Sequence, residues 1–341
     1  MRTEVVADWS RWLGAEPPEA RDVYFDPAYV ALHREGRPEA IVVTDGEHRL
    51  IVSGLVTPIP GVERSLADLQ SPNGYGGPLV TPGAPPAFLA EAWSAWSEAA
   101  CAAGVVAALF RLHPLLENRA ALPAGAAIVA DRATVYVALT EGLAAAWDGA
   151  ESRHRNMVNR GRREGTQPRW NADEDWAAFA TLYSAAMDRL SAPARLRFDV
   201  EYFQRLRVLD GAELVAVRDG GGLVAAQVFL WGPCWGHYHL AARRPDAPNY
   251  VMSLLLQHGL ERAAARGLRG LHLGGGATPS PDDGVLRFKR SLGGAELRFE
   301  LGLVISDVAR YRELVQVWER REGRPPNWLL GYRQPHAAPG S

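Results

Sequence analysis

The sequence predicts an α/β protein with a mixed sheet, built as two units of similar plan that follow one another along the chain. The chain has 341 residues, which is more than one ordinary domain needs and enough for two. In each half, short apolar segments joined by tight turns come before a helical segment and a further apolar segment, an order typical of mixed sheets. Residues 99–110 and 263–273 also echo one another, because each combines a helix end, a glycine and an apolar strand. This internal repeat favours two copies of one unit.

The first half contains a clear hairpin. Residues 40–44 and 50–53 are rich in Ile and Val and flank Asp45 and Gly46, a dipeptide that favours a tight turn between antiparallel strands. The apolar pattern that follows predicts a helix at residues 86–103 and strands at 105–110 and 133–138.

The second half repeats this order after two helices. We expect a basic helix at about residues 153–165 and an amphipathic helix at 172–190. The expected strands are 213–217, 223–230, 234–240 and 268–273, with a helix at 250–266 before the last one. We therefore place the domains at residues 1–148 and 149–330, with residues 331–341 as a tail.

Composition excludes several classes of protein. With 47% hydrophobic and 22% charged residues, the chain is neither disordered nor fibrous. It has no apolar run long enough to span a membrane and no secretory signal pattern at its start, so we expect a cytoplasmic protein. Cys101 and Cys234 are too few for a disulfide framework or a zinc site, and we expect neither a metal nor a cofactor. A net charge of −2 argues against a broad coat of nucleic acid but allows a local basic stripe.

The basic residues are divided unevenly between two types. Of the 37 basic residues, 36 are arginine, and the single lysine is Lys289. Arginine replaces lysine readily as a surface charge, but not where a compact ammonium must meet one atom. The lysine is therefore either a chance survivor in an arginine-rich chain or a residue whose role arginine cannot fill.

The order of hairpin, strand, helix and strand in each half fits the N-acetyltransferase (GNAT) fold. An early GxGxxG motif, which a dinucleotide-binding fold would need, is missing from the sequence. Near the end of the second half, Phe288 and Lys289 form an aromatic–lysine pair, and a glycine turn at Gly293 and Gly294 follows. With these residues the chain resembles the Fem-like family, two-domain GNAT-fold proteins that transfer an amino acid from aminoacyl-tRNA to an amine.

The resemblance extends over about residues 22–315. Further segments similar to the family are residues 22–29, 75–78, 111–114, 155–160 and 237–240. The long helical arm of some Fem proteins has no counterpart in the sequence, so we expect two GNAT-like domains without a coiled-coil arm.

The resemblance implies a set of site residues. Lys289 is expected to act in a solvated cleft on the charge of the ester oxygens, and Phe288 to shape the pocket for the tRNA end. His239 and Tyr238 point to opposite faces of a predicted strand, and we expect them to line the reaction centre. The expected substrate contacts are Tyr75, Gly76, Arg111, His113, Asn156, Arg160 and Tyr250. The expected tRNA contacts are Arg155, Arg162, Arg163, Arg287 and Arg290. A solvated helix is the alternative for the arginines of the basic segment.

One segment bears on the choice of acyl donor. GNAT domains that use acyl-CoA hold its pyrophosphate on a glycine-rich loop before a helix. Residues 241–249 contain no glycine, and Pro245 and Pro248 lack a donor N–H. Residues 73–77 are glycine-rich and are expected to precede a helix, so a phosphate cradle and a plain turn both stay open there.

The sequence thus favours an aminoacyltransferase that moves an amino acid from aminoacyl-tRNA to an amine acceptor and forms an amide bond. We expect the acceptor to be a natural-product or peptidoglycan-type precursor, and the missing arm favours a natural product, as in antibiotic biosynthesis. Two alternatives stay open: an acyl-CoA-dependent N-acyltransferase of the GNAT fold, and a non-catalytic GNAT-like binding protein.

Overall fold

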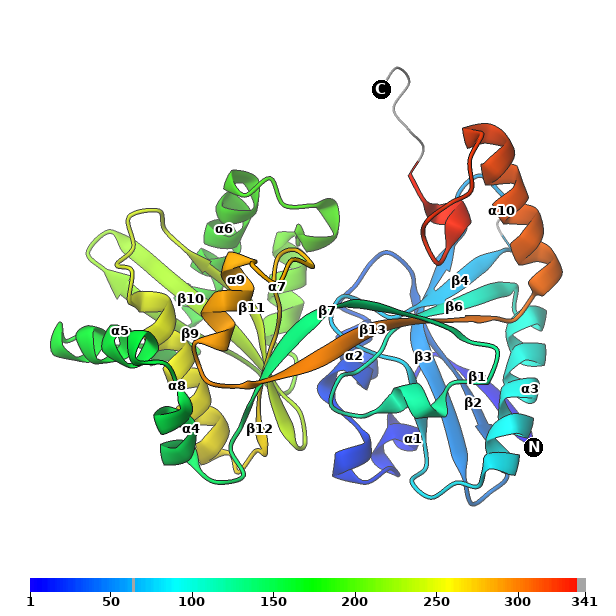
Figure 1. The fold of residues 1–341 in the computed structure, drawn as a ribbon, viewed down its shortest axis with the longest axis horizontal. Coiled ribbons are helices and arrows are strands. Elements are labelled where there is room, and N and C mark those ends of the chain that lie inside the picture. The colour runs from blue at the N-terminus through cyan, green and yellow to red at the C-terminus, as the bar shows by residue number, and fades with distance from the viewer. Residues whose placement is uncertain (63–64, 336–341) are drawn as a thin grey trace. The chain divides into compact units, whose positions relative to one another are not determined.

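The chain forms two compact units. The computed structural model describes residues 1–62 and 65–335. Unit 1 consists of Met1–Asp131 and Phe299–Ser341, and unit 2 of Arg132–Arg298. The chain leaves unit 1 inside β7 (Ala127–Ala138) and returns to it inside β13 (Ala295–Ile305) (Figure 1).

These units correct the domain limits that were expected from the sequence. The expected boundary after residue 148 falls inside unit 2, because β7 pairs with β12 (Gly270–Gly275) from Thr134 to Ala138. The expected tail is folded through residue 335, since Arg333 donates hydrogen bonds to the buried carboxylate of Asp68 and, at 2.7 Å, to the carbonyl of Thr57. Residues 336–341 lie outside the described residues.

Unit 1 is built on a sheet in the order β1-β2-β3-β4-β6-β13, with β5 paired to β3. Within the described part of unit 1, β4 and β6 pair in parallel, and the other neighbouring strands pair antiparallel. The strands are β1 (Arg2–Val6), β2 (Arg37–Thr44), β3 (Arg49–Pro58), β4 (Ala67–Gln70), β5 (Pro78–Val80) and β6 (Val105–Arg111). The helices are α1 (Ser10–Gly14), α2 (Pro27–Val30), α3 (Pro86–Ala102) and α10 (Val308–Glu322). The hairpin, helix and strand expected between residues 40 and 110 are thereby confirmed.

The core of unit 1 lies between α3 and its sheet. Pro86 begins the helix, where its missing N–H costs nothing. Phe88, Trp93 and Trp96 then recur at helical spacing and pack on strands β2, β3 and β6. The helix ends at Gly104, which has φ +74°, and a Cβ there would lie 2.0 Å from the carbonyl oxygen of Ser65. Glycine is therefore required at this turn.

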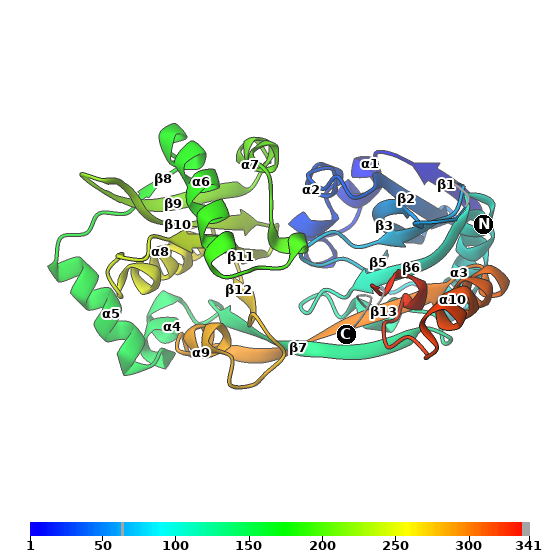
Figure 2. The same ribbon diagram turned by 90° about the horizontal axis from the view of Figure 1, so that it is seen from above.

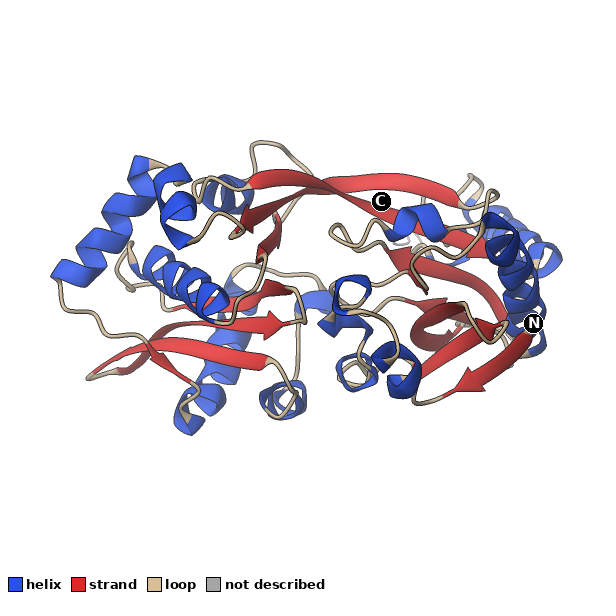
Figure 3. Cartoon of the chain, turned by 90° about the horizontal axis from the view of Figure 1, so that it is seen from below, coloured by secondary structure: helices blue, strands red, loops and turns tan. Residues whose placement is uncertain are grey.

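Unit 2 repeats the plan, with helices on both faces of its sheet (Figures 2 and 3). The strand order is β13-β7-β12-β11-β10-β9-β8. The helices are α4 (Leu143–Gly149), α5 (Ser152–Arg163), α6 (Asp173–Arg189), α7 (Val200–Arg207), α8 (Val251–Ala265) and α9 (Gly284–Arg290). The strands other than β7, β12 and β13 are β8 (Arg169–Trp170), β9 (Ala212–Asp219), β10 (Gly222–Trp231) and β11 (Trp235–Arg243). Helices α6 and α8 both pack on β10 and β11. Helix α5 packs on α8. The helices and strands predicted for this half are confirmed within a few residues.

The sheet of unit 2 opens between its two parallel strands. Strand β11 pairs with β12 only from Trp235 to His237, opposite Gly270 to His272. Beyond His237, β11 continues to Arg243 along β10, so the two parallel strands part. We call this point the fork. Among the described residues, no helix is both long and apolar enough to cross a membrane.

Candidate functional site

Helix α9 places the single lysine of the chain beside β12. Asp283 begins the helix and accepts hydrogen bonds from the backbone N–H groups of Val285 and Leu286, both at 2.9 Å. The same carboxylate accepts bonds from the amide and hydroxyl of Thr278, both at 3.0 Å. Although burial favours its neutral form, these hydrogen bonds lower the pKa of Asp283 to about 2. The loop before α9 and the helix start are thus tied together.

Lys289 is buried, which corrects the expectation of a solvated cleft. Its side chain points to the end of β12, where Nζ donates a 2.6 Å hydrogen bond to the carbonyl of Gly275. The ammonium also lies 5.4 Å from the ring centre of Tyr238, close enough for a cation–π contact. Burial lowers the pKa of Lys289 to about 7, against the opposing charge of Asp283. Both the amine and the ammonium are therefore accessible near neutral pH.

The residues expected around Lys289 divide between the two faces of β11. Tyr238 and Phe288 pack against the hydrophobic core beneath α8, and burial raises the pKa of the Tyr238 hydroxyl. His239 points to the other face, where its Nε2 is 2.9 Å from the hydroxyl of Tyr202 on α7. The structure brings Lys289 and Tyr238 together but places His239 apart from them.

Two histidines at the fork were not selected from the sequence. His237 and His272 are paired residues on β11 and β12, both buried, with ring centres 5.7 Å apart. Thr134 donates its hydroxyl hydrogen to the carbonyl of Leu297 at 3.3 Å. It therefore accepts from His272 Nε2, at 3.0 Å, which places a proton on that nitrogen. The sequence signal was a histidine within an otherwise apolar predicted strand.

In unit 1, the structure brings together four of the expected substrate contacts. Tyr75 lies against His113 with ring centres 5.5 Å apart. Arg111 donates to the carbonyl of Gly74 at 2.8 Å. Asn118 joins this group by accepting from the backbone N–H of His113 and donating to the carbonyl of Gly76. The four are therefore Tyr75, Gly76, Arg111 and His113.

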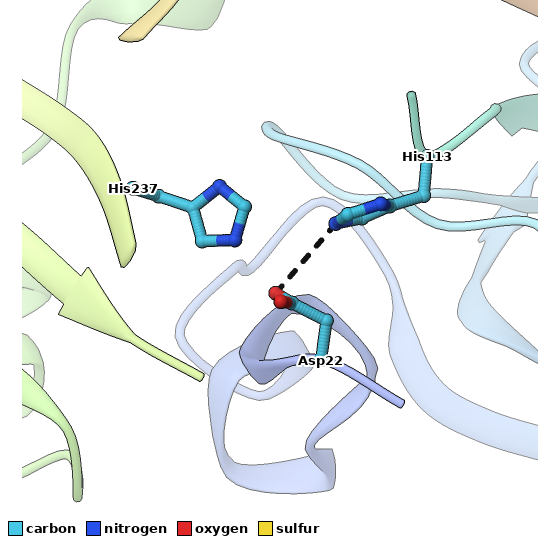
Figure 4. Close-up of side chains that lie close together, drawn as sticks. All are labelled: Asp22, His113 and His237. Carbon is cyan, nitrogen blue, oxygen red and sulfur yellow. Dashed lines mark ion pairs between the residues drawn. The ribbon is translucent and has the colours of Figure 1, made fainter. Parts of the chain in front are cut away.

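His113 faces Asp22, a residue not selected individually from the sequence (Figure 4). Its Nε2 lies 3.7 Å from Asp22 Oδ1, and both side chains are fully buried. The other ring nitrogen accepts a 3.2 Å hydrogen bond from the N–H of Leu115. The proton of the neutral ring is therefore on Nε2, directed to the carboxylate.

The glycine-rich loop at residues 73–77 precedes strand β5, and not a helix as expected. Tyr29 donates its hydroxyl to the carbonyl of Asn73 at 2.5 Å. Gly74 has φ +103°, and a Cβ there would lie 2.4 Å from the ring of Tyr24. Close approach of the backbone to aromatic rings accounts for this glycine.

The arginines of the basic helix α5 have different surroundings. Arg155 donates to the carbonyls of Asp148, at 3.1 Å, and Ala150. Arg160 and Arg162 form ion pairs with Glu164 and Glu261, at 2.7 and 2.8 Å. Arg163 and Asn156 are exposed. The hydrogen bonds of Arg155 therefore stabilise the turn before α5, whereas Arg160, Arg162 and Arg163 lie on the surface of the helix.

The two arginines of α9 also differ. Arg290 forms a bidentate pair with Glu296 at 2.7 and 2.9 Å and bonds to the carbonyl of Pro281. Arg287 is exposed.

A cavity of about 320 Å³ lies at the end of α5, beside the start of α8. Tyr250 lines it and exchanges a 2.9 Å hydrogen bond with the hydroxyl of Thr166. The loop between β11 and α8 contributes Pro248, one of the two prolines noted in the sequence.

Comparisons with known proteins agree with this architecture. Residues 152–290 match a family model described as an acetyltransferase (GNAT) domain. No curated protein matches the chain. FemX has a similar structure, with a TM-score of 0.69 at 14% identity over 92% of this chain and 99% of its own.

Two further structures are similar at low identity. One is the C-terminal domain of a protein assigned as a lysylphosphatidylglycerol synthetase from Agrobacterium fabrum, with a TM-score of 0.55 at 15% identity over 87% of this chain and 90% of that one. The other is a tandem GNAT protein from the clavulanic acid biosynthesis pathway, with a TM-score of 0.50 at 14% identity over 89% and 99%. The expected fold of two GNAT-like units is confirmed, and so is the likeness to Fem-type structures at the level of the fold.

Proposed function

We propose that this protein transfers an aminoacyl group from aminoacyl-tRNA to an amine and so forms an amide bond. The observation that carries the proposal is the position of Lys289, whose amine is held at the end of β12 in the unit that matches the GNAT domain. The likeness to FemX over almost the whole chain supports it. In the Fem-like family that the sequence resembles, the aromatic–lysine pair belongs to this reaction.

For this reaction the protein must mainly position the two substrates and stabilise the charge that develops on the ester oxygens. The donor ester is already activated, so the acceptor amine attacks its carbonyl directly. The N–C bond forms, the bond to the ribose oxygen breaks, and the amine proton is transferred to the departing oxygen. We assign Lys289 to this oxygen, because an amine with a pKa of about 7 can donate a proton and take one up again at neutral pH. Tyr238 and Phe288 hold its surroundings apolar.

The neighbouring residues are assigned as follows. Substrate contacts are assigned to Tyr75, Gly76, Arg111, His113, Asn156, Arg160 and Tyr250, as the resemblance to the Fem-like family implies. The exposed arginines, Arg160, Arg162, Arg163 and Arg287, contact the tRNA. A charged tRNA donor also places the protein in the cytoplasm. The acceptor class is a natural-product or peptidoglycan-type amine.

An acyl-CoA-dependent N-acyltransferase is the second candidate, because the matched family model is that of an acetyltransferase domain. The loop before α8 argues against it. Pro245 and Pro248 withhold two backbone donors, and no glycine lets the backbone approach a pyrophosphate.

The test is turnover of radiolabelled aminoacyl-tRNA with a panel of amines, with and without ribonuclease. We expect ribonuclease-sensitive transfer of label to the amine and no saturable binding of acetyl-CoA in calorimetry. Micromolar binding of acetyl-CoA, with turnover that ribonuclease does not affect, would establish the second candidate instead.

A further inference from the structure

Apart from Tyr250, none of the residues that line the cavity at the end of α5 has been given a role in the reaction. Its volume of about 320 Å³ is within the lower range of ligand pockets. Val217, Val224 and Val251 are buried and provide apolar walls. The exposed or half-exposed lining residues include Gly165, Pro248 and four polar residues: Thr166, Gln167, Arg218 and Asp219. An apolar interior with a polar rim suits a flat, partly polar group.

The charges at the rim are balanced. Arg218 pairs with the buried Asp175 at 2.9 Å, and Asp219 pairs with Arg244 at 2.6 Å. A carboxylate that is already present at the rim disfavours a phosphate or another anion in the cavity. The rim thus favours a neutral group that offers both hydrogen-bond donors and acceptors.

The surface next to the cavity favours an RNA strand. Arg160 lies over the ring of Tyr250, with 5.6 Å between guanidinium and ring centre, and Arg162 lies over Trp147 at 5.3 Å. Arginines alternating with aromatic rings are typical of surfaces that bind unpaired nucleic acid, where the cations meet phosphates and the rings meet bases. A strand whose phosphates follow α5 would bring a base to the cavity.

We propose that this cavity binds one unpaired nucleobase of the donor RNA, and that cytosine fits it best. The carboxylate of Asp219 can accept from the exocyclic amino group of cytosine, while the guanidinium of Arg218 can donate to its ring nitrogen and carbonyl. Every tRNA ends in an unpaired C-C-A sequence, which supplies such a base. The inference rests on the proposed function for the identity of the RNA, but the base site has its own test.

The test measures binding of a fluorescein-labelled RNA hexamer ending in C-C-A to the full chain by anisotropy at low salt. Each cytosine is replaced in turn by an abasic residue. We expect one of the two replacements to weaken binding roughly tenfold, as the loss of a seated base would. In Thr166→Phe, whose ring fills the cavity, the intact and abasic hexamers should bind alike. Val208→Phe adds the same bulk at an exposed position of unit 2 and should behave as the wild type.

A second variant tests the identity of the base. In Asp219→Asn, the side-chain amide can donate to the carbonyl of uracil, so the preference between cytosine and uracil at the sensitive position should shrink or reverse. Equal losses for abasic RNA in the wild type and in Thr166→Phe, together with an unchanged preference in Asp219→Asn, would overturn the base site. A small amine that binds the cavity and competes with no RNA would overturn it too. If either of these results overturns the base site, transfer from charged tRNA should still be observed. If the wild type fails to transfer from charged tRNA, the proposed function is overturned, and the hexamer result stands.

Discussion

The two units carry the same parallel pair of strands, but only unit 2 lets the pair separate. In unit 1, β4 and β6 pair from Ala67 to Gln70, and a bridge between Gly76 and Leu112 continues the contact beyond the strands. In unit 2, the pairing of β11 with β12 stops at His237. Strands that stay paired satisfy one another's backbone groups, whereas beyond the fork β11 and β12 no longer hydrogen-bond to each other.

The two units also differ in the surroundings of a buried ionisable residue, Asp68 in unit 1 and Lys289 in unit 2. In unit 1, Asp68 on the closed strand β4 binds Tyr332 at 2.5 Å and also Arg333, which fastens the end of the chain to the sheet. In unit 2, Lys289 is buried near the opening, as are the two histidines of the fork, and its Nζ donates a hydrogen bond to the neutral carbonyl of Gly275. Asp68 therefore helps to hold the end of the chain on the sheet, whereas burial of Lys289 lowers its pKa and so disfavours the charged form in the folded state.

The largest effect is expected for Lys289→Met. The substitution keeps an unbranched side chain that is one atom shorter and removes the amine, so transfer from charged tRNA should fall by about 100- to 1000-fold. Turnover under single-turnover conditions with labelled aminoacyl-tRNA measures this. Wild-type turnover would contradict any contact between this amine and the reacting ester.

Lys289→Arg should also be inactive, and it should be less stable than the wild type. The guanidinium cannot shed its proton, so a charge is forced into a site that lowers the pKa of the lysine to about 7. The folded-state pKa lies below the unfolded value of 10.5, so the unfolded chain binds more protons between these limits. Wild-type stability should therefore rise as pH increases from about 7 to about 10. In thermal melts, Lys289→Met should lack this rise of stability with pH. If Lys289 were exposed, the wild type would not show the rise either.

A substitution in unit 1, whose parallel strands stay paired, should change the stability of the protein and not the rate of transfer. Asp68→Ala leaves Arg333 without its carboxylate in a buried site, which we expect to destabilise unit 1 by about 3 kcal/mol. Burial raises the pKa of Asp68, while the charge of Arg333 and the hydroxyl of Tyr332 oppose this shift. Urea unfolding measures the loss. Glu313→Ala, which removes an exposed ion pair on α10, should change stability by less than about 0.5 kcal/mol. Equal effects of the two substitutions would contradict the fastening role of Asp68.

A smaller effect is expected in the framework of unit 2. Glu213 accepts hydrogen bonds from Arg262, at 2.7 and 2.9 Å, and from Trp231 at 2.8 Å. Although burial opposes ionisation, these donors lower the pKa of Glu213 to about 2. Its folded pKa is below the unfolded value of 4.5, so its contribution is present above about pH 4.5 and lost as pH falls toward 2.

Glu213→Gln should accordingly cost about 2 kcal/mol at pH 7 and flatten the acid limb of the stability curve. Glu174→Gln offers a matched control, because Glu174 is exposed and pairs with Arg169. Its substitution should leave the acid limb nearly unchanged. A steep acid limb in Glu213→Gln would show that other carboxylates set it.

The sequence predicted most elements because their signals are local. The hairpin at Asp45 and Gly46, the apolar face of α3 and the order of strands in both halves all follow from short-range patterns. The domain limits did not follow, because the pairing of β7 and the return of the chain through β13 are long-range. Lys289 stood out by being the single lysine, but its burial depends on β11 and β12, which the composition of residues 286–294 does not reveal.

The remaining site residues show the same division. The histidines at the fork and the pair of Asp22 with His113 join segments far apart in the chain, so no spacing in the sequence relates them. Arg155 lies in a segment that resembles the family, yet its guanidinium is used by backbone carbonyls. A basic helix predicts where charge gathers, but which of its arginines remain available is decided by neighbours in space.

The smallest effect is expected for the exposed arginines of α5. Arg163→Ala and Arg160→Ala should each weaken binding of tRNA by less than about tenfold and lower the slope of log affinity against log salt by about 1. Fluorescence anisotropy over a range of salt concentrations measures both quantities. Arg310→Ala removes an exposed arginine from α10 in unit 1 and should leave the slope as it is. Because Arg160 is already paired with Glu164, its loss should cost less affinity than that of Arg163. If neither substitution changes the slope, α5 is a solvated helix, and the RNA must contact unit 2 elsewhere or not at all.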